Sequence, residues 1–450
     1  MRKYLYSLLC LCTALAAVPC FGSPDVWGIY DDKPQAVCNQ VSLTGDLDLA
    51  TLTEAAICNN QALKISYLSA LSAGAAYGQG LAEYMPSVNL SGSVSANNQK
   101  QDGGASDKTS PLGASANVNW LLLDFGGRGA NADRLKAALQ SSYFAYDNTL
   151  QTLLYDVAAT YYSALSATEK YEGLLTSEES SKKSFEEASS RYKLGLVPLS
   201  DKLQAQTSYD QARLASNVAR KNIAIELGNL ATLLNVSPDL HFKLVRPEKK
   251  VTDKGQVEAF DQLVAKALSA RPDFKAAEYD VLASQKQIDV AKSDGLPYLS
   301  AGASASANKD IRSGSDGVYS GSAGLTLTVP FFTGFSSSYK IGQAQAQYEK
   351  AQKTLQKTKD TILNEVWAAV QDYQTSLESF KISKSLLASA EENERVAFAS
   401  YKVGKVNILT LLDAQSSLAS ARVEHSTTFY NFLTAKVNLQ KVLGQMERVK

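Results

Sequence analysis

Residues that could carry out chemistry are few in this sequence and widely spaced. The chain of 450 residues holds only two histidines, His241 and His425, far apart and with no cysteine nearby. No glycine-rich loop with a lysine is present that would cradle a nucleotide phosphate. No acid–base pair or nucleophile constellation is visible either. We therefore expect no enzymatic activity, no metal site and no cofactor.

Composition and charge exclude further classes of protein. Lysine and arginine together number 45, as do aspartate and glutamate, so no basic face is present to bind nucleic acid. Only 11 prolines occur, and Ala, Ser, Gln, Leu and Lys are used heavily. This composition suits long helices better than a compact enzyme core.

An internal repeat carries the residues of greatest interest. The stretch YKVGKVNILTLLDAQSSLASAR at 401–422 recurs in looser form as YKLGLVPLSDKLQAQTSYDQAR at 192–213, with an offset of 209 and no gap. In each copy a glycine ends a long segment whose apolar residues recur every three or four positions, and a second such segment follows. The pattern predicts two helical hairpins. The expected segments are a long helix at 129–194, a tip at 195–198 and a return helix at 199–235, then 336–403, 404–407 and 408–444 in the second copy.

Two pairs of short segments alternate between apolar and small polar residues with the period of a β-strand. They cover residues 87–97, 112–124, 298–308 and 319–331. Strands of about ten residues with one apolar face are typical of outer-membrane barrels, although a sandwich with one wet face is the alternative. Four strands cannot close a barrel, and lipid does not tolerate open edges, so several copies of the chain must pool their strands.

The repeat defines the domain organisation that we expect. The fold is dominated by helices with a small membrane β part, and the first repeat also holds a helix at 51–84 along the upper part of the long helix. The second repeat holds helices at 258–294 in the corresponding place. The divisions are residues 1–22 as a signal peptide, 23–235 as the first repeat, 236–257 as an equatorial linker and 258–450 as the second repeat.

The N-terminus has the features of a secretory signal. A short positive region precedes the apolar run YLYSLLCLCTALAAV, and small residues follow, which predicts cleavage after Gly22. Lipidation at Cys20 stays an open alternative. The mature chain would keep Cys38 and Cys58, and an even pair in an oxidising compartment predicts one disulfide, two separate buried thiols being the alternative.

These features resemble the TolC family of outer-membrane export ducts over nearly all of the mature chain. The most specific motifs are the two tips, the strand-to-helix turns LLLDFGGR and VPFFTGFSSS, and the helix-ending Pro86 and Pro297. In LTEAAICNNQALK, the pair Asn60-Gln61 stands where an Asn-Pro pair is usual in the family. The resemblance implies a TolC-like duplicated unit, three copies of which share a 12-stranded β-barrel continued by a long helical barrel in the periplasm.

The family's gate residues can be carried over by matching the tip motifs. The resemblance gives Asp201 the part of the gate aspartate and Tyr401 the part of the gate tyrosine. Val406 stands where the family has an arginine, so that ion pair is missing. Lys405 beside it is a candidate source of the missing charge, an ordinary surface lysine being the alternative.

The constriction of the tunnel is lined in the family by two aspartates per protomer. Here Asp413 is retained and Thr410 replaces the other. Three Asp413 side chains around a threefold axis would make an electronegative throat that favours cations and holds polyvalent cations less tightly than six carboxylates would. The alternative is that Asp413 and Asp201 only solvate their helix faces.

The same resemblance implies partners and a location. A periplasmic adaptor would dock on the two tips, joining the homotrimer in the outer membrane of a Gram-negative bacterium to an inner-membrane pump or ABC transporter. The implied docking residues are Leu194, Gly195, Leu196, Val403, Gly404 and Lys405.

The expected function is the passive exit duct of a tripartite export system, gated at its periplasmic tips. The cargo is either a secreted protein, as in type I secretion, or small toxic molecules, as in drug efflux. Cys58 with its upstream cysteine resembles members associated with protein secretion. A stand-alone diffusion porin with a helical extension is the alternative function, and a coiled-coil spacer is disfavoured by the alternating strands.

Overall fold

The computed structural model describes residues 45–99, 107–239, 243–247, 258–310, 312 and 317–446. The expected signal peptide, Cys38 and His241 lie outside these residues. The chain divides into two compact units. Of the described residues, those within Leu71–Leu123 and Leu299–Leu327 belong to the sheet unit, and those within Ala36–Ala70, Asp124–Tyr298 and Thr328–Lys450 belong to the helical unit.

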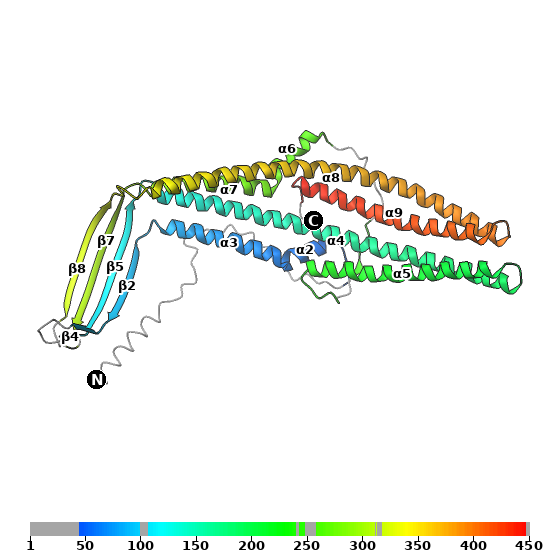
Figure 1. The fold of residues 1–450 in the computed structure, drawn as a ribbon, viewed down its shortest axis with the longest axis horizontal. Helices are drawn as coiled ribbons and strands as arrows, with labels where there is room; N and C mark the ends of the chain where they lie inside the picture. The colour runs from blue at the N-terminus through cyan, green and yellow to red at the C-terminus, as the bar shows by residue number, and fades with distance from the viewer. Residues whose placement is uncertain are drawn as a thin grey trace. The chain divides into compact units, whose positions relative to one another are not determined.

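Long helices make up most of the helical unit, and they occur in matched pairs. Helices α4 (Gly127–Lys193) and α8 (Ser336–Lys402) have 67 residues each, and α5 (Leu199–Leu233) and α9 (Ile408–Val442) have 35 each. In both pairs the second member begins 209 residues after the first. Figure 1 shows α5 folded back along α4, and α9 along α8. The mostly helical fold with few strands is therefore confirmed.

Shorter helices are paired in the same way. Helices α2 (Leu49–Asn59) and α6 (Phe260–Ala270) have 11 residues, and α3 (Gln61–Ala82) and α7 (Pro272–Ser293) have 22. The sequence predicted one continuous helix over 51–84, but the chain breaks at Asn60. The side chain of Asn60 accepts a hydrogen bond from the amide of Leu63 and donates one to the carbonyl of Leu233, and both bonds stabilise the break.

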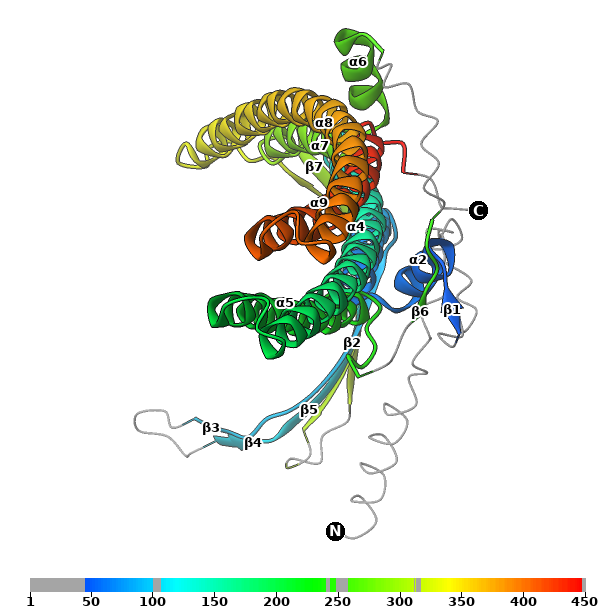
Figure 2. The same cartoon turned by 90° about the vertical axis from the view of Figure 1, so that its right-hand side faces the viewer.

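Helix α7 joins the two repeats, because it packs against both long helices. The rings of Phe144 on α4 and Tyr279 on α7 stack with centroids 5.5 Å apart, and Lys340 on α8 pairs with Asp294 at the end of α7 at 2.8 Å. Within its first residues, α3 also contacts α4 through the ring of Tyr67. Figure 2 shows α5, α4, α9 and α8 following one another along a curve, with α7 beside both α4 and α8.

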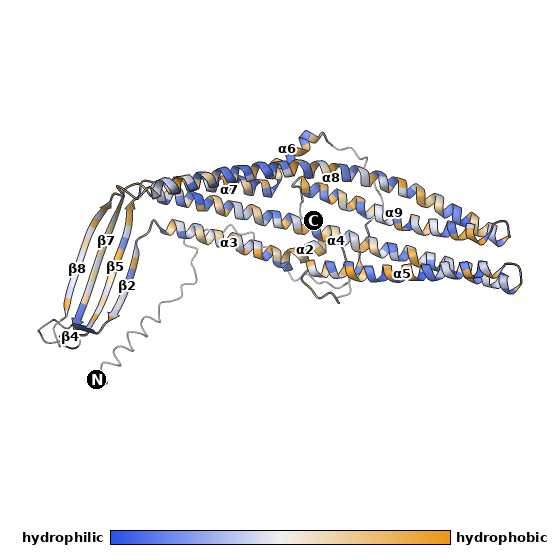
Figure 3. Ribbon diagram, viewed as in Figure 1, coloured by the Kyte–Doolittle hydropathy of each residue, from blue (hydrophilic) through white to orange (hydrophobic). Residues whose placement is uncertain are grey.

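The largest apolar core of the helical unit lies where α2 packs against α4. Leu52, Ala55 and Ala56 of α2 are fully buried there with Val157 of α4 and Phe429 of α9. Along the helices, hydrophilic and hydrophobic residues are interspersed (Figure 3). Among the described helices, none combines the length and apolar character needed to span a bilayer.

Four strands form the main sheet in the order β2-β5-β7-β8, with antiparallel pairing of β2 with β5 and of β5 with β7. The strands are β2 (Ser87–Val94), β5 (Pro111–Leu123), β7 (Tyr298–Asp310) and β8 (Val318–Thr328). Each repeat thus supplies one hairpin. The first hairpin is extended by β3 (Asn97–Gln99) and β4 (Asp107–Thr109), which pair as a separate two-stranded antiparallel sheet. In the helical unit, β1 (Asp46–Leu47) pairs with β6 (Lys243–Leu244) of the linker.

The two faces of the sheet differ in polarity, as the alternation predicted. A row of serines crosses all four strands, with Ser91 bonded to Ser115 and Ser306 bonded to Ser320, each at 2.7 Å, and with Ser115 paired to Ser306 in register. Large apolar residues lie exposed on these strands, among them Leu90 with 78% and Leu325 with 69% of its surface accessible.

Candidate functional site

The two helical tips have the same backbone turn. Gly195 and Gly404 adopt φ angles of +70° and +75°, which favour glycine over residues with a side chain. The amide of Leu196 donates to the carbonyl of Arg191, and that of Lys405 donates to the carbonyl of Ser400, both at 2.9 Å. These are the bonds of a Schellman motif, which ends a helix and reverses the chain.

The return helices begin differently in the two tips. Asn407 caps α9, and its side-chain oxygen accepts from both the amide and the hydroxyl of Thr410, at 2.9 and 2.8 Å. Helix α5 instead follows Pro198 and has Asp201 in its first turn, where a carboxylate interacts favourably with the helix dipole. The hydroxyl of Thr410 is therefore engaged locally at the helix start.

A buried apolar cluster, which we call the tip cluster, joins the two hairpins. Tyr401, Ile408 and Leu411 of the second hairpin pack there with Ala188 and Ala205 of the first. Val406 packs against the same cluster. An arginine at position 406 would place its charge against the apolar tip cluster, and removing that charge from water costs free energy. A valine packs there without this cost.

Tyr401 is the centre of this contact, with only 2% of its surface exposed. Its hydroxyl has no hydrogen-bond partner among the described residues. Burial raises the pKa of Tyr401, the charge of Arg191 opposes this shift, and the carboxylates of Asp201 and Glu187 add to it. Asp201 thus lies near Tyr401 without bonding to it.

Arg191 is a residue of this site that the sequence analysis missed. Its guanidinium carbon lies 4.8 Å from the centroid of the Tyr401 ring, and its Nη2 donates to the carbonyl of Lys402. Its Nε also pairs with Glu187 on the same helix at 2.9 Å. The sequence does hold one signal for Arg191, which is a difference between the two copies of the repeat: Ser400 stands in the second copy where Arg191 stands in the first.

The other residues singled out at the tips lie at the surface of the chain. Lys405 is exposed and makes no ion pair with Asp201 within the described residues. Asp413 is exposed on α9. Of the expected docking residues, Leu194, Leu196 and Val403 expose 73, 69 and 68% of their surface. The tips therefore present a small apolar surface around two glycines.

A buried polar contact adds to the connection between the hairpins. Gln415 of α9, 6% exposed, donates to the hydroxyl of Ser184 on α4 at 2.9 Å and to Glu394 on α8 at 3.3 Å. Its side-chain oxygen has no partner among the described residues. This contact was not predictable from the sequence, because an isolated glutamine gives no periodic signal.

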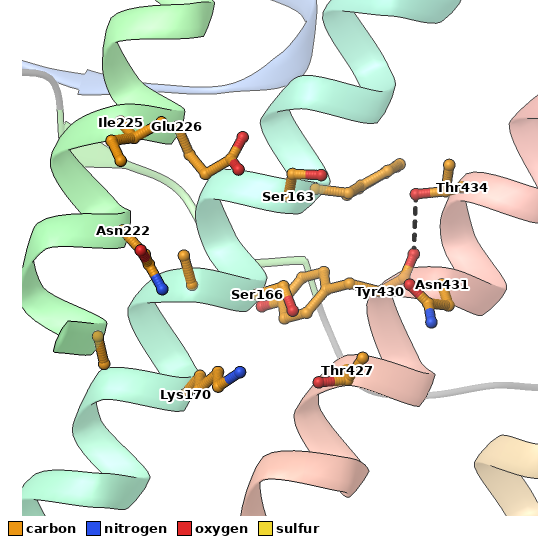
Figure 4. A pocket seen from close by; sticks show the side chains of 13 residues that line it. Ser163, Ser166, Lys170, Asn222, Ile225, Glu226, Thr427, Tyr430, Asn431 and Thr434 are labelled. Atoms are coloured by element: carbon orange, nitrogen blue, oxygen red, sulfur yellow. Dashed lines mark hydrogen bonds between the residues drawn. The ribbon is translucent and has the colours of Figure 1, made fainter. Parts of the chain in front are cut away.

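Further from the tips, a polar hollow of about 430 Å³ lies between α4, α5 and α9 (Figure 4). Hydroxyl and amide side chains dominate its lining, which includes Ser163, Ser166, Asn222, Thr427 and Asn431. The described residues contain no group of histidine, cysteine, aspartate and glutamate side chains arranged to hold a metal ion. Two charged side chains, Lys170 of α4 and Glu226 of α5, complete this polar lining.

The expected disulfide can be followed at one end only. Cys58, near the end of α2, is disulfide-bonded. Cys38 lies outside the described residues, so the pairing of Cys38 with Cys58 stays a prediction.

Comparison with known proteins gives a consistent result. The family model described as outer membrane efflux protein matches residues 52–236 and 263–445. Protein CyaE of Bordetella pertussis is 28% identical over 405 residues, covering 90% of this chain and 85% of the relative. The probable efflux pump outer membrane protein TtgC of Pseudomonas putida is 27% identical, with 89 and 83% covered.

Solved structures support the same fold. The Campylobacter jejuni CmeC outer membrane channel superposes with a TM-score of 0.78 at 19% identity, over 89% of this chain and 87% of the other. The outer membrane protein VceC from Vibrio cholerae gives 0.75 at 18% identity, over 88 and 96%. At these identities the likeness concerns the fold alone.

Proposed function

The chain belongs to the outer membrane efflux protein family, and on that premise we propose that it is the outer-membrane exit duct of a tripartite export system. The duct conducts cargo passively from machinery that spans the periplasm to the exterior. It catalyses no reaction and uses no cofactor. Most of the chain lies in the periplasm, and only the main sheet lies in the outer membrane of a Gram-negative cell.

The observation that carries the proposal is the main sheet. Its strands expose large apolar side chains such as Val88, Leu90 and Leu327, while a serine row marks the other face. A water-soluble sheet would bury its apolar face against a second layer, whereas a membrane sheet turns that face to lipid and its polar face to the lumen. The sheet therefore supports a water-filled passage through a bilayer.

The edges of the sheet support assembly of several copies. Strands β2 and β8 are its end members and have no further strand beside them among the described residues. Pairing β8 of one copy with β2 of the next removes both edges and closes a ring when the rotation between copies closes. Three copies would supply twelve strands, above the minimum of about eight for a barrel.

The helical unit supports the same arrangement, in which one side of each copy packs against the opposite side of the next copy. Leu214 and Val218 form an exposed apolar stripe on α5, and Ile382 and Leu386 form another on α8. Figure 2 shows α5 near one end of the curved row of helices and α8 towards the other. Packing α5 of one copy against α8 of the next would bury both stripes and close a helical barrel.

The tips are assigned to the gate and to docking. Asp201 and Tyr401 belong to the gate, and Asp413, with Thr410 one turn before it, faces the constriction. The exposed Leu194, Leu196 and Val403 accept a periplasmic adaptor, through which an inner-membrane pump or ABC transporter delivers cargo. Exposed apolar residues at a sharp turn suit contact with the tip of another helical hairpin.

Deletion of the gene in its native host tests the proposal and identifies the cargo. We expect either the loss of one or a few secreted proteins from the medium or hypersensitivity to dyes, detergents and antibiotics. Loss of secretion alone would identify a protein-secretion duct, and hypersensitivity alone would identify an efflux duct.

Complementation with the intact gene is the control, because it must restore the lost phenotype. A deletion strain that loses only passive uptake of small solutes, with secretion and drug resistance intact, would contradict the proposal. That result would favour a diffusion porin.

A further inference from the structure

The contacts of Arg191 lead to an inference that rests on the proposed function and deepens it. We propose that Arg191 holds the two helical tips of one protomer together in the closed duct, and so replaces the charge that Val406 lacks. The group formed by Arg191, Tyr401 and Lys402 is called the tip clasp below. The clasp acts within one protomer, from the end of the first hairpin to the end of the second.

The geometry of the clasp is specific to an arginine. The guanidinium lies over the face of the Tyr401 ring, 4.8 Å from its centroid, as a cation–π contact requires. At the same time it donates to the carbonyl of Lys402, the last residue of α8. The last carbonyls of a helix lack a partner within the helix, so the arginine satisfies one of them. A lysine has no planar group that could do both.

The surroundings make these contacts strong. The side chain of Arg191 is only 18% exposed, and Glu187 pairs with it at 2.9 Å and fixes its direction. Glu187 lies on the same helix as Arg191, so that pair survives any movement of one hairpin against the other. The contacts to Tyr401 and Lys402 cross between hairpins and must break when the tips separate.

The other contacts between the tips are less directional. Ala188 and Ala205 offer small apolar surfaces to the tip cluster, and such surfaces slide past each other at little cost. Hydrogen bonds and ring contacts have preferred distances and angles. Arg191 therefore distinguishes the observed arrangement of the tips from a displaced one more sharply than the apolar cluster does.

Two other groups that could hold the helical tips together, the charge of Lys405 and the hydroxyl of Tyr401, do not fit the structure. Lys405 is exposed and makes no ion pair with Asp201 in the described chain. The hydroxyl of Tyr401 is buried without a hydrogen-bond partner among the described residues. The ring of Tyr401, and not its hydroxyl, is thus the part that the clasp uses.

Single-channel recording of the full-length protein in planar lipid bilayers tests the clasp. We expect Arg191→Gln to raise the open probability at least about tenfold, which corresponds to about 1.4 kcal/mol. Arg191→Lys should give a smaller increase in the open probability, because lysine keeps the positive charge and loses only the planar guanidinium group. Tyr401→Leu should behave like Arg191→Gln, whereas Tyr401→Phe should leave the closed state unchanged.

A matched control is Arg213→Gln on α5. Arg213 also lies over a tyrosine ring, that of Tyr209, at 5.5 Å, but the tyrosine is on its own helix and the arginine is exposed. Its loss should leave the open probability unchanged. A closed state that survives in Arg191→Gln, or one that is lost in Tyr401→Phe, would overturn the proposal.

Hydrogen exchange separates a failed clasp from a failed duct. In Arg191→Gln, the amides of residues 190–196 and 400–406 should exchange faster than in the wild type, while those of the α2 core stay protected. Unchanged exchange at both tips would overturn the clasp even if the protein conducts. A wild-type protein that conducts steadily would overturn the duct proposal itself, because no closed state would exist for Arg191 to hold.

Discussion

Asn60 and Arg271 break the shorter helices of the two repeats at equivalent positions and with the same backbone geometry. Asn60 has φ −62° and ψ 127°, and Arg271 has φ −65° and ψ 126°. Asn60 donates to the carbonyl of Leu233 at 3.1 Å, and Arg271 donates to that of Val442 at 3.4 Å. Each break is thereby tied to the last turn of the return helix in its own repeat.

The first prediction concerns the break at Asn60. Asn60→Ala removes the bond to Leu233 and the cap that Asn60 gives to the amide of Leu63, so we expect a loss of about 1–2 kcal/mol in unfolding free energy. Thermal unfolding in detergent measures it. Asn229→Ala, at an exposed position of α5 with only a local bond to Glu226, is the matched control. Equal melting temperatures for the two variants would show that the hydrogen bonds of Asn60 do not stabilise the fold.

The second prediction concerns Arg271, whose side chain is 11% exposed and pairs with both Asp273 and Glu365 at 2.6 Å. Arg271→Gln removes the charge-assisted hydrogen bonds to these partly exposed carboxylates, and we expect a loss of about 2–3 kcal/mol in unfolding free energy. Arg271→Lys should lose less, because it retains the charge. The measurement is the urea midpoint of each variant, and a lysine variant as unstable as the glutamine variant would show that charge is not what matters.

The third prediction is a pH dependence at Asp156. Burial raises the pKa of Asp156, and the charge of Lys441 only partly offsets this. The folded state therefore holds the proton to a higher pH than the unfolded state, so ionisation costs stability as the pH rises through the folded pKa. Asp156→Asn removes that cost and should raise the melting temperature at pH 7 by about 1–3 °C.

The gain from Asp156→Asn should shrink as the pH falls through the folded pKa and should disappear well below the ordinary aspartate value of 3.8, where both states are protonated. Asp210→Asn, at an exposed position on α5, is the control that relieves no burial. A gain that persists unchanged at low pH would point to a cause other than the ionisation of Asp156.

The fourth prediction concerns the constriction. Asp413→Asn should lower the preference of the open channel for cations over anions, because it removes the carboxylates proposed for the throat. Thr410→Asp adds a second ring of carboxylates to the throat and should tighten the block of the channel by trivalent cations. Reversal potentials and block curves measure these effects. If neither variant changes them, Asp413 does not line the passage.

The repeat and the helix-rich fold were predictable because they depend on local signals. Glycines that adopt positive φ mark both tips, and alternation of apolar and polar residues marks the strands of the main sheet. The break at Asn60 was not predictable from the same signals, since no proline follows it and the bond to Leu233 spans 173 residues. Tertiary contact decides the conformation there.

The candidate site was predictable only in part, for the same reason. Matching the tip motifs identified Tyr401 and the tip turns. The same matching suggested Lys405, and not Arg191, as the source of the positive charge that is missing at Val406. Arg191 lies on the other hairpin, 210 residues before Tyr401 in sequence, and nothing in the spacing links the two. Only the packing of the two hairpins brings the guanidinium over the ring.

The conductance of the purified wild-type protein in planar bilayers tests the gated duct directly. We predict a channel that is closed most of the time, opens briefly, and prefers cations. A channel that conducts steadily at high conductance would contradict the gated exit duct and favour a diffusion porin. A protein that inserts and never conducts would contradict a passage through the membrane altogether.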